Sequence, residues 1–135
     1  MNTLSNEKIY GFMKTAMNAA AVRHQVISAN LANIDTPGYK ARDMDFEKVL
    51  QDYEDQENML PDERRDVNRP STGRKALDFH DYMVDMNESA ITERFDGNNV
   101  NLDQEVSKLA LTRGRFNIAT QFINTRVRLI NDLIR

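Results

Sequence analysis

The sequence has no cysteine and no tryptophan, and its 135 residues include only three prolines and five glycines. Without cysteine, a disulfide framework and a thiolate metal site are both excluded. No apolar run reaches the ~18 to 20 residues that a membrane-spanning helix needs. The N-terminus also lacks the basic, apolar and small-residue succession of a cleaved signal peptide. The default expectation is therefore a cytoplasmic chain, unless export uses an uncleaved signal.

The net charge of -3 is unevenly distributed along the chain. Residues 1–39 carry three basic and two acidic side chains, residues 40–96 carry nine and sixteen, and residues 97–135 carry six and three. The corresponding net charges are +1, -7 and +3, so an acidic middle separates two weakly basic ends. A nucleic-acid partner is not expected, because phosphate binding requires a concentrated basic face.

The first third of the chain has the pattern of one long helix. From Leu4 to Ile34 there is no proline, and Gly11 is the only glycine. Apolar or small residues follow the alternating spacing of three and four that defines a helix face. These residues are Ile9, Met13, Ala16, Met17, Ala20, Ile27, Leu31 and Ile34. Arg23 and Asn30 interrupt the stripe, so this helix requires a partner to be stable.

The C-terminal third repeats more regularly. Its apolar residues recur every seven positions over five heptads, which predicts a helix of more than thirty residues, about 50 Å long, built for side-by-side packing. Asn101 is a suitable N-cap, and Gln104 stands three residues later, as in a capping box. An amphipathic helix in a compact bundle is the alternative. The predicted helix seam consists of Leu102, Val106, Leu109, Phe116, Ile123, Val127, Ile130 and Ile134.

The middle of the chain is predicted to be irregular and rich in loops, with little or no strand. A short helix is expected from Asp45 to Tyr53. Residues 76–84 fit either a short helix or a strand, and residues 90–95 alternate as a short strand does.

Sequence motifs for catalysis or metal binding are missing. His24 and His80 stand alone, without the spacing of a ligand pair. Residues 92–103 fail as a calcium loop, since Thr92 stands where an aspartate ligand is required. The chain shows no phosphate-binding glycine loop, no dinucleotide fingerprint and no HExxH pair. We therefore expect no enzyme activity, no metal, no cofactor and no small-molecule substrate.

The stretch "SANLANIDTPGYKARDMDF", residues 28–46, is the most distinctive in the chain. Pro37 and Gly38 suit the central positions of a type II turn, so the preceding helix is expected to end near Ile34 or Asp35. The amides of Asn30 and Asn33 can bond the carbonyl groups freed at that end, or a neighbouring backbone. A capped helix end followed by a turn explains this local shape. It does not explain why a long amphipathic helix stands at the other end of the chain.

Two segments resemble one family. "ANLANIDTPGYKARDMDF" is similar to the N-terminal signature of the bacterial flagellar axial proteins of the rod and hook, and "DGNNVNL", residues 96–102, resembles the family's lead into its C-terminal helix. This chain departs from the family at Asn101, where an acidic residue is frequent, and at Val106, where methionine is frequent. The resemblance covers both ends of the chain. It points to an assembly motif formed by Asn30, Asn33, Asp35, Thr36, Pro37, Gly38 and Tyr39.

The resemblance implies a mainly α fold whose long N- and C-terminal helices pair as a coiled-coil-like hairpin. It divides the chain into an N-terminal helix of an inner, assembly domain (1–35), an acidic middle (36–100) and a C-terminal helix of that domain (101–135).

The implied function is a structural, torque-transmitting subunit of the proximal rod in the flagellar basal body. It would be exported without a cleaved signal by the flagellar type III apparatus. The implied partners are other rod subunits, further copies of the chain, and the basal-body ring and rod-adaptor proteins. A cytoplasmic coiled-coil interaction module or chaperone-like adaptor is the alternative.

Overall fold

The computed structural model describes residues 3–58, 77–86 and 94–134, with side chains described for residues 8–58, 77–86 and 94–132. The elements, in chain order, are α1 (Thr3–Ala32), β1 (Arg42–Met44), α2 (Phe46–Asn58), the 3-10 helix η1 (Phe79–Tyr82), β2 (Met83–Asp85) and α3 (Leu102–Ile134).

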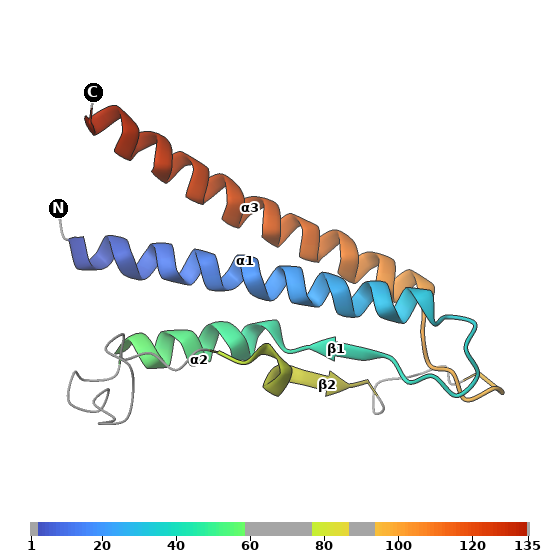
Figure 1. Cartoon of the computed structure of the whole chain (residues 1–135). Helices are drawn as coiled ribbons and strands as arrows, with labels where there is room; N and C mark the ends of the chain where they lie inside the picture. The colour runs from blue at the N-terminus through green and yellow to red at the C-terminus, as the bar shows by residue number, and fades with distance from the viewer. Residues whose placement is uncertain (1–2, 59–76, 87–93, 135) are drawn as a thin grey trace.

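The two long helices lie side by side and run in opposite directions, so that both chain termini are at the same end of the molecule (Figure 1). This arrangement confirms the predicted mainly α fold with a hairpin of terminal helices. The backbone amides of Gln104 and Glu105 donate to the side chain and the carbonyl of Asn101, respectively, which makes Asn101 the N-cap of α3 as predicted. Within the described residues, no helix is long and apolar enough to cross a membrane.

Helix α1 ends at Ala32, two or three residues before the predicted position. The Asn33 amide is shared between the carbonyls of Ala29 and Asn30, and the Ile34 amide bonds the Leu31 carbonyl three residues back. Such short-range bonds tighten the last turn and end the α-helix early. The Tyr39 amide then bonds the Thr36 carbonyl, closing the predicted turn.

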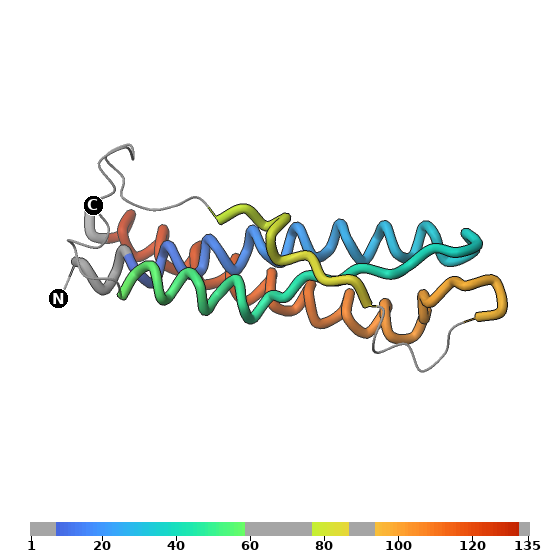
Figure 2. Tube along the Cα trace, turned by 90° about the horizontal axis from the view of Figure 1, so that it is seen from below, coloured from blue at the N-terminus to red at the C-terminus, as the bar shows by residue number. Residues whose placement is uncertain are grey.

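A second layer covers one side of the helix pair. In Figures 1 and 2, α2 and the two short strands lie along α1 and α3 as a shorter strip. The strands are antiparallel, with Arg42 opposite Asp85 and Met44 opposite Met83. The short helix predicted near residues 45–53 is confirmed as α2, and residues 76–84 contain both a 3-10 turn and part of a strand. Of the strand predicted at residues 90–95, positions 90–93 lie outside the described residues.

The buried core lies where the layer of α2 and the strands meets the helix pair. Its residues come from α1, β1, α2 and η1, and they are Ala19, Ala20, Met44, Phe46, Val49 and Tyr82. The guanidinium of Arg115, on α3, lies 4.5 Å from the centre of the Phe46 ring, which adds a cation–π contact between α3 and α2. The small Ala19 and Ala20 side chains let the layers approach closely.

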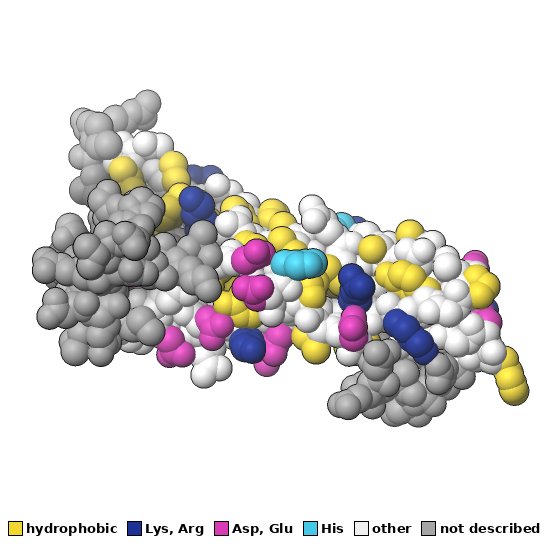
Figure 3. All heavy atoms as spheres, turned by 60° about the horizontal axis from the view of Figure 1, so that its bottom comes forward, with side chains coloured by type: hydrophobic (Ala, Val, Ile, Leu, Met, Phe, Trp, Pro, Cys, Tyr) yellow, Lys and Arg dark blue, Asp and Glu magenta, His cyan; other side chains and the backbone are white. Residues whose placement is uncertain are grey.

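Acidic side chains gather on the outer face of α2 and η1 (Figure 3). Glu54, Asp55 and Asp81 are exposed there. One carboxylate, that of Asp52, turns inward and accepts a 2.8 Å hydrogen bond from the Tyr82 hydroxyl. Burial and this neighbouring carboxylate raise the pKa of Tyr82 to about 12. The outer face of α2 and η1 is therefore solvated, and Asp52 forms an internal tether between these two elements.

Candidate assembly site where the two motifs join

Asn30 lies at the centre of the first motif and is fully buried. Its amide nitrogen donates to the Arg42 carbonyl at 2.6 Å and to Glu105 Oε2 at 2.9 Å. Its oxygen accepts bonds from the Arg42 amide at 3.1 Å and from the Tyr39 hydroxyl at 3.2 Å. All four hydrogen-bonding positions of the side chain are thus used. One side chain joins α1, the following turn, β1 and α3.

Asn98, in the second motif, binds the end of α1 and is also fully buried. Its amide nitrogen lies 3.0, 3.1 and 2.8 Å from the carbonyl oxygens of Asn33, Ile34 and Thr36, respectively. Its oxygen accepts from the Val100 amide at 2.8 Å. A helix end leaves several carbonyls without partners. Asn98 supplies those partners from a segment more than sixty positions away in the chain.

The next residue, Asn99, repeats this arrangement one step further along. Its oxygen accepts from the Ala41 amide at 2.6 Å, and its nitrogen donates to the Met86 carbonyl at 3.2 Å. Asn98 and Asn99 together hold the segments on both sides of the motif turn. Both residues belong to the second motif, "DGNNVNL", but neither was among the residues predicted for the assembly motif.

Two glycines provide the backbone conformation where these segments meet. Gly38 has φ +71° and Gly97 has φ +77°, a backbone region that strains other residues. A side-chain carbon added at Gly97 would lie 3.6 Å from the Gly38 Cα. The Gly38 amide also donates to the Asp96 carbonyl at 2.8 Å. The positive φ at Gly38 is the geometry that a type II turn requires.

The rest of the predicted assembly motif forms the tip of this end of the molecule. Asp35, Thr36 and Pro37 are exposed, and the Asp35 carboxylate lies 4.0 Å from the Arg94 guanidinium. Asn33 stabilises the helix end by donating to the Ala29 carbonyl at 2.8 Å. The structure therefore places Asn30 and Tyr39 inward as tethers and leaves the tip accessible. A role of the tip in assembly stays a prediction.

A charged network lies beside Asn30, between α1, β1 and α3. Arg23 forms two hydrogen bonds with the Asp43 carboxylate, at 2.8 and 2.9 Å. Lys108 lies 3.4 Å from that carboxylate and 2.8 Å from Glu105, which in turn accepts from Asn30. The side chains of Arg23 and Lys108 are each 18% exposed, and that of Asp43 is 11% exposed. Two cations and two carboxylates thus balance within a largely buried cluster.

The pKa of Asp43 reflects this arrangement. Burial raises the pKa, but the hydrogen bonds from Arg23 and from the Met44 amide, with the charges of Arg23 and Lys108, lower it more strongly. The net result is a pKa below the usual value of 3.8. Asp43 is therefore ionised in the folded chain wherever the network is intact.

This lowered pKa predicts a specific acid sensitivity. Because Asp43 binds a proton less readily when folded than when unfolded, its stabilising contribution is complete above pH 3.8 and is lost as the pH falls through the lower, folded value. Urea unfolding of the natural chain and of Asp43→Asn, measured from pH 6 to pH 2.5, should show a stability gap that is constant above pH 4.5 and narrows below 3.8. A gap of constant size down to pH 2.5 would contradict the assignment.

The predicted seam on α3 is not the line that lies deepest against α1. Glu105, Thr112 and Ala119 occupy that line, each 2% exposed. Short side chains are favoured there because they allow the helices to approach closely. Among the seam residues, Leu109 and Ile123 are half-buried beside this line. The side chain of Ile134 lies outside the described side chains. The more exposed seam residues are Leu102 (53%), Val106 (50%), Phe116 (37%), Val127 (48%) and Ile130 (52%).

The polar side chains of this site hold segments of the chain together. Over residues 3–58, 77–86 and 94–134, no group of three or more His, Asp or Glu side chains is placed to hold a metal ion. Asn30, Asn98 and Asn99 join segments that are distant in the chain, and the bonds between Arg23 and Asp43 close a charge pair. The arrangement can fix the angle between the hairpin and the strip of α2 and the strands.

Comparison with known proteins finds a family whose model matches most of the first motif. The family model described as "Flagella basal body rod protein" matches residues 13–40. A Bacillus subtilis (strain 168) protein is 27% identical over 127 residues, covering 90% of this chain and 89% of its own. An Aeromonas hydrophila protein is 25% identical over 132 residues, covering 92% and 90%. An Escherichia coli (strain K12) protein is 54% identical over 39 residues, covering 29% and 28%.

The chain is similar to the flagellar basal body rod proteins, a structural component of the flagellum and not a known enzyme family. All three relatives carry the name "Flagellar basal body rod protein FlgB". Two of them align over nearly their whole length, so the similarity includes the middle of the chain as well as the signature. The predicted resemblance to the flagellar axial proteins is confirmed.

Proposed function

We propose that this chain is a subunit of the proximal part of the flagellar rod, and that it assembles there through its terminal helices. In this proposal, residues 1–35 and 101–135 form the inner, assembly unit, and residues 36–100 form the loop-rich acidic middle segment. The described hairpin of α1 and α3, with α2 and the strands on one side only, supports this division.

The single observation that carries the proposal is the amount of large apolar surface on α3. Leu102, Val106, Val127 and Ile130 each remain about half exposed in one copy. A monomeric protein rarely keeps so many apolar residues exposed along one helix, and contiguous patches of this kind mark interaction sites. We propose that neighbouring rod subunits, including further copies of this chain, cover them.

The joined motifs suit a part that transmits torque. Asn30 uses its full bonding capacity inside the molecule, Asn98 binds three carbonyl groups at the end of α1, and the network of Arg23 and Asp43 ties α1 to β1. A subunit under torsion has to keep its two layers from sliding past each other, and buried, fully satisfied polar groups fix such relative positions. The basal-body ring and rod-adaptor proteins and the flagellar type III export apparatus are the further partners that we propose.

A chaperone-like adaptor in the cytoplasm is the competing function, and a truncation separates the two. A chain ending at Asn101 keeps α1 and the acidic middle but loses α3. We expect it to leave cells that lack the natural gene without flagella and non-motile, because the exposed apolar face that neighbours would cover is gone. Soft-agar swarming and electron microscopy of basal bodies measure this.

The full-length chain from the same plasmid is the control, with immunoblots showing equal amounts of both. Normal motility with the truncated chain would contradict the proposed function. Recovery of the full-length chain only in the cytoplasm of motile cells would favour the adaptor.

A further inference from the structure

Helix α3 carries a second apolar stripe, which does not coincide with the predicted seam. It consists of Leu111, Ile118, Phe122 and Leu129, which are 66%, 66%, 36% and 56% exposed. The spacings of seven, four and seven residues place all four side chains on one face of the helix. At about 1.5 Å per residue, the stripe extends for about 27 Å. Three of the four side chains, those of Leu111, Ile118 and Leu129, are therefore more than half exposed on this face.

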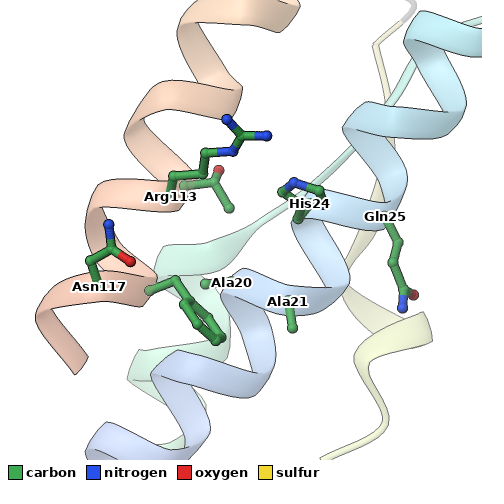
Figure 4. Close-up of a pocket in the computed structure, with 8 residues that line it drawn as sticks. Ala20, Ala21, His24, Gln25, Arg113 and Asn117 are labelled. Carbon is green, nitrogen blue, oxygen red and sulfur yellow. The ribbon is translucent and has the colours of Figure 1, made fainter. Parts of the chain in front are cut away.

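A groove of about 490 Å³ runs between α1 and α3 (Figure 4). Ala20, Ala21 and His24 line it from α1, and Arg113 and Asn117 line it from α3. Alanine side chains keep the groove open, because larger residues at the same places would fill it. The groove is the uncovered side of the contact between the two helices, since α2 and the strands cover the other side.

The stripe and the groove lie on opposite sides of α3. Leu111 and the groove residue Arg113 are two positions apart in the chain, and so are Ile118 and the groove residue Phe116. At 3.6 residues per turn, residues two positions apart point about 200° away from each other. One hairpin therefore offers large apolar side chains on one side and, on the other, a groove that has Ala20 and Ala21 among longer, mostly polar side chains.

We propose that the stripe of Leu111, Ile118, Phe122 and Leu129 in one copy of the chain packs into the α1–α3 groove of the next copy. This inference rests on the proposed function and specifies one contact within the rod. The two surfaces differ, so the contact is heterologous: each copy uses its stripe toward one neighbour and its groove toward the other. Such a contact can repeat around or along a tube.

The size of the surfaces favours a neighbouring copy in an assembly over a stable dimer. A strip about 27 Å long and about 10 Å wide covers a few hundred Å² on each partner, below the about 800 Å² per partner of a stable pair. One such contact is too small to hold two free chains together. A subunit inside the rod makes this contact with two neighbours, so it gains the binding free energy twice. The contact is therefore expected only in the assembled state.

Because the chain has no natural cysteine, single introduced cysteines report on this contact directly. Cells lacking the natural gene would express two differently tagged copies. One copy carries Ile118→Cys in the stripe. The other carries one cysteine on the groove side of α1, as Asn18→Cys, Ala21→Cys or Gln25→Cys in turn, to allow for an axial offset between neighbours. A short bismaleimide is added to isolated basal bodies from motile cells, and links between the two tags are detected by immunoblot.

We expect a linked pair for at least one groove position, and loss of that band when Asn124→Cys replaces Ile118→Cys. Asn124 is exposed and lies two positions after Phe122, so it points away from the stripe. Links only between two Ile118→Cys copies would overturn the inference, because the stripes would then face each other. The absence of any link at all three groove positions would overturn it too, while leaving the proposed function intact, provided that both chains are in the basal bodies. Absence of the chain from basal bodies of motile cells would instead refute the proposed function.

Discussion

Replacing Asp43 with alanine is expected to lower the free energy of unfolding by about 3–5 kcal/mol. The substitution leaves the Arg23 guanidinium and the Lys108 ammonium, each only 18% exposed, without the carboxylate that both approach. The amide of Met44 also loses its 2.7 Å bond to the same side chain. Arg23 then has no counter-charge and Lys108 keeps only Glu105, which costs more than the loss of a hydrogen bond alone. Urea unfolding at pH 7, followed by circular dichroism, measures the difference.

Asp85 provides the matched control for this substitution. It lies on the paired strand, opposite Arg42, and forms an ion pair with it at 3.5 Å. Both side chains are more than 60% exposed, so Asp85→Ala is expected to cost less than about 1 kcal/mol. Equal losses for the two alanine variants would show that the buried network contributes no more than a surface pair. The double variant Arg23→Ala/Asp43→Ala should cost less than the sum of the single changes, because each removes the other's unpaired charge.

The polar residues that interrupt the first helical stripe mark positions where the helix is buried against polar partners. Arg23 and Asn30 stand where a strict apolar seam would continue, and this weakens the predicted stripe. The structure shows that both point inward, Arg23 to Asp43 and Asn30 to Arg42 and Glu105. A polar residue at a buried helical position requires a partner. Helical spacing places Arg23 and Asn30 on that face. It does not identify the residues that bind them, because those residues lie in other segments of the chain.

The local features of the chain were predictable because short-range geometry determines them. Gly38 supplies the positive φ of the turn, Asn101 caps α3, and α2 forms where apolar residues recur at helical spacing. The contact line between the long helices was less predictable. The predicted seam follows the apolar residues of α3 that recur every seven positions and their companions, whereas Thr112 and Ala119 lie deepest against α1. The large apolar residues of α3 that do not lie against α1 remain exposed, and they are the basis of the proposed assembly surfaces.

The structural role of the two motifs depends on contacts between them. Asn98 was visible in "DGNNVNL", but the helix end that it binds is more than sixty positions earlier in the chain. Spacing within one segment carries no information about such a pairing. Once α1 and α3 form an antiparallel hairpin, the residues just after α1 and just before α3 have to lie together at the same end (Figure 1). The topology therefore explains why asparagine side chains from both motifs, and one glycine from each, meet at this end.

Replacing Asn98 with alanine is expected to lower the free energy of unfolding by about 2–4 kcal/mol, at about 1 kcal/mol for each hydrogen bond lost. The change removes the donors to the carbonyls of Asn33, Ile34 and Thr36 and the acceptor for the Val100 amide.

Asn98→Asp separates this role from simple packing, since it keeps the shape and the acceptor but loses the amide donors. It should therefore destabilise the chain at neutral pH at least as much as alanine does. Asn33→Ala, whose two side-chain bonds are exposed, is the control and should cost less than about 1 kcal/mol. Urea unfolding ranks the three variants, and amide exchange at the end of α1 locates the effect. If Asn98→Asp were as stable as the natural chain, the three carbonyl contacts would not be what holds the two motifs together.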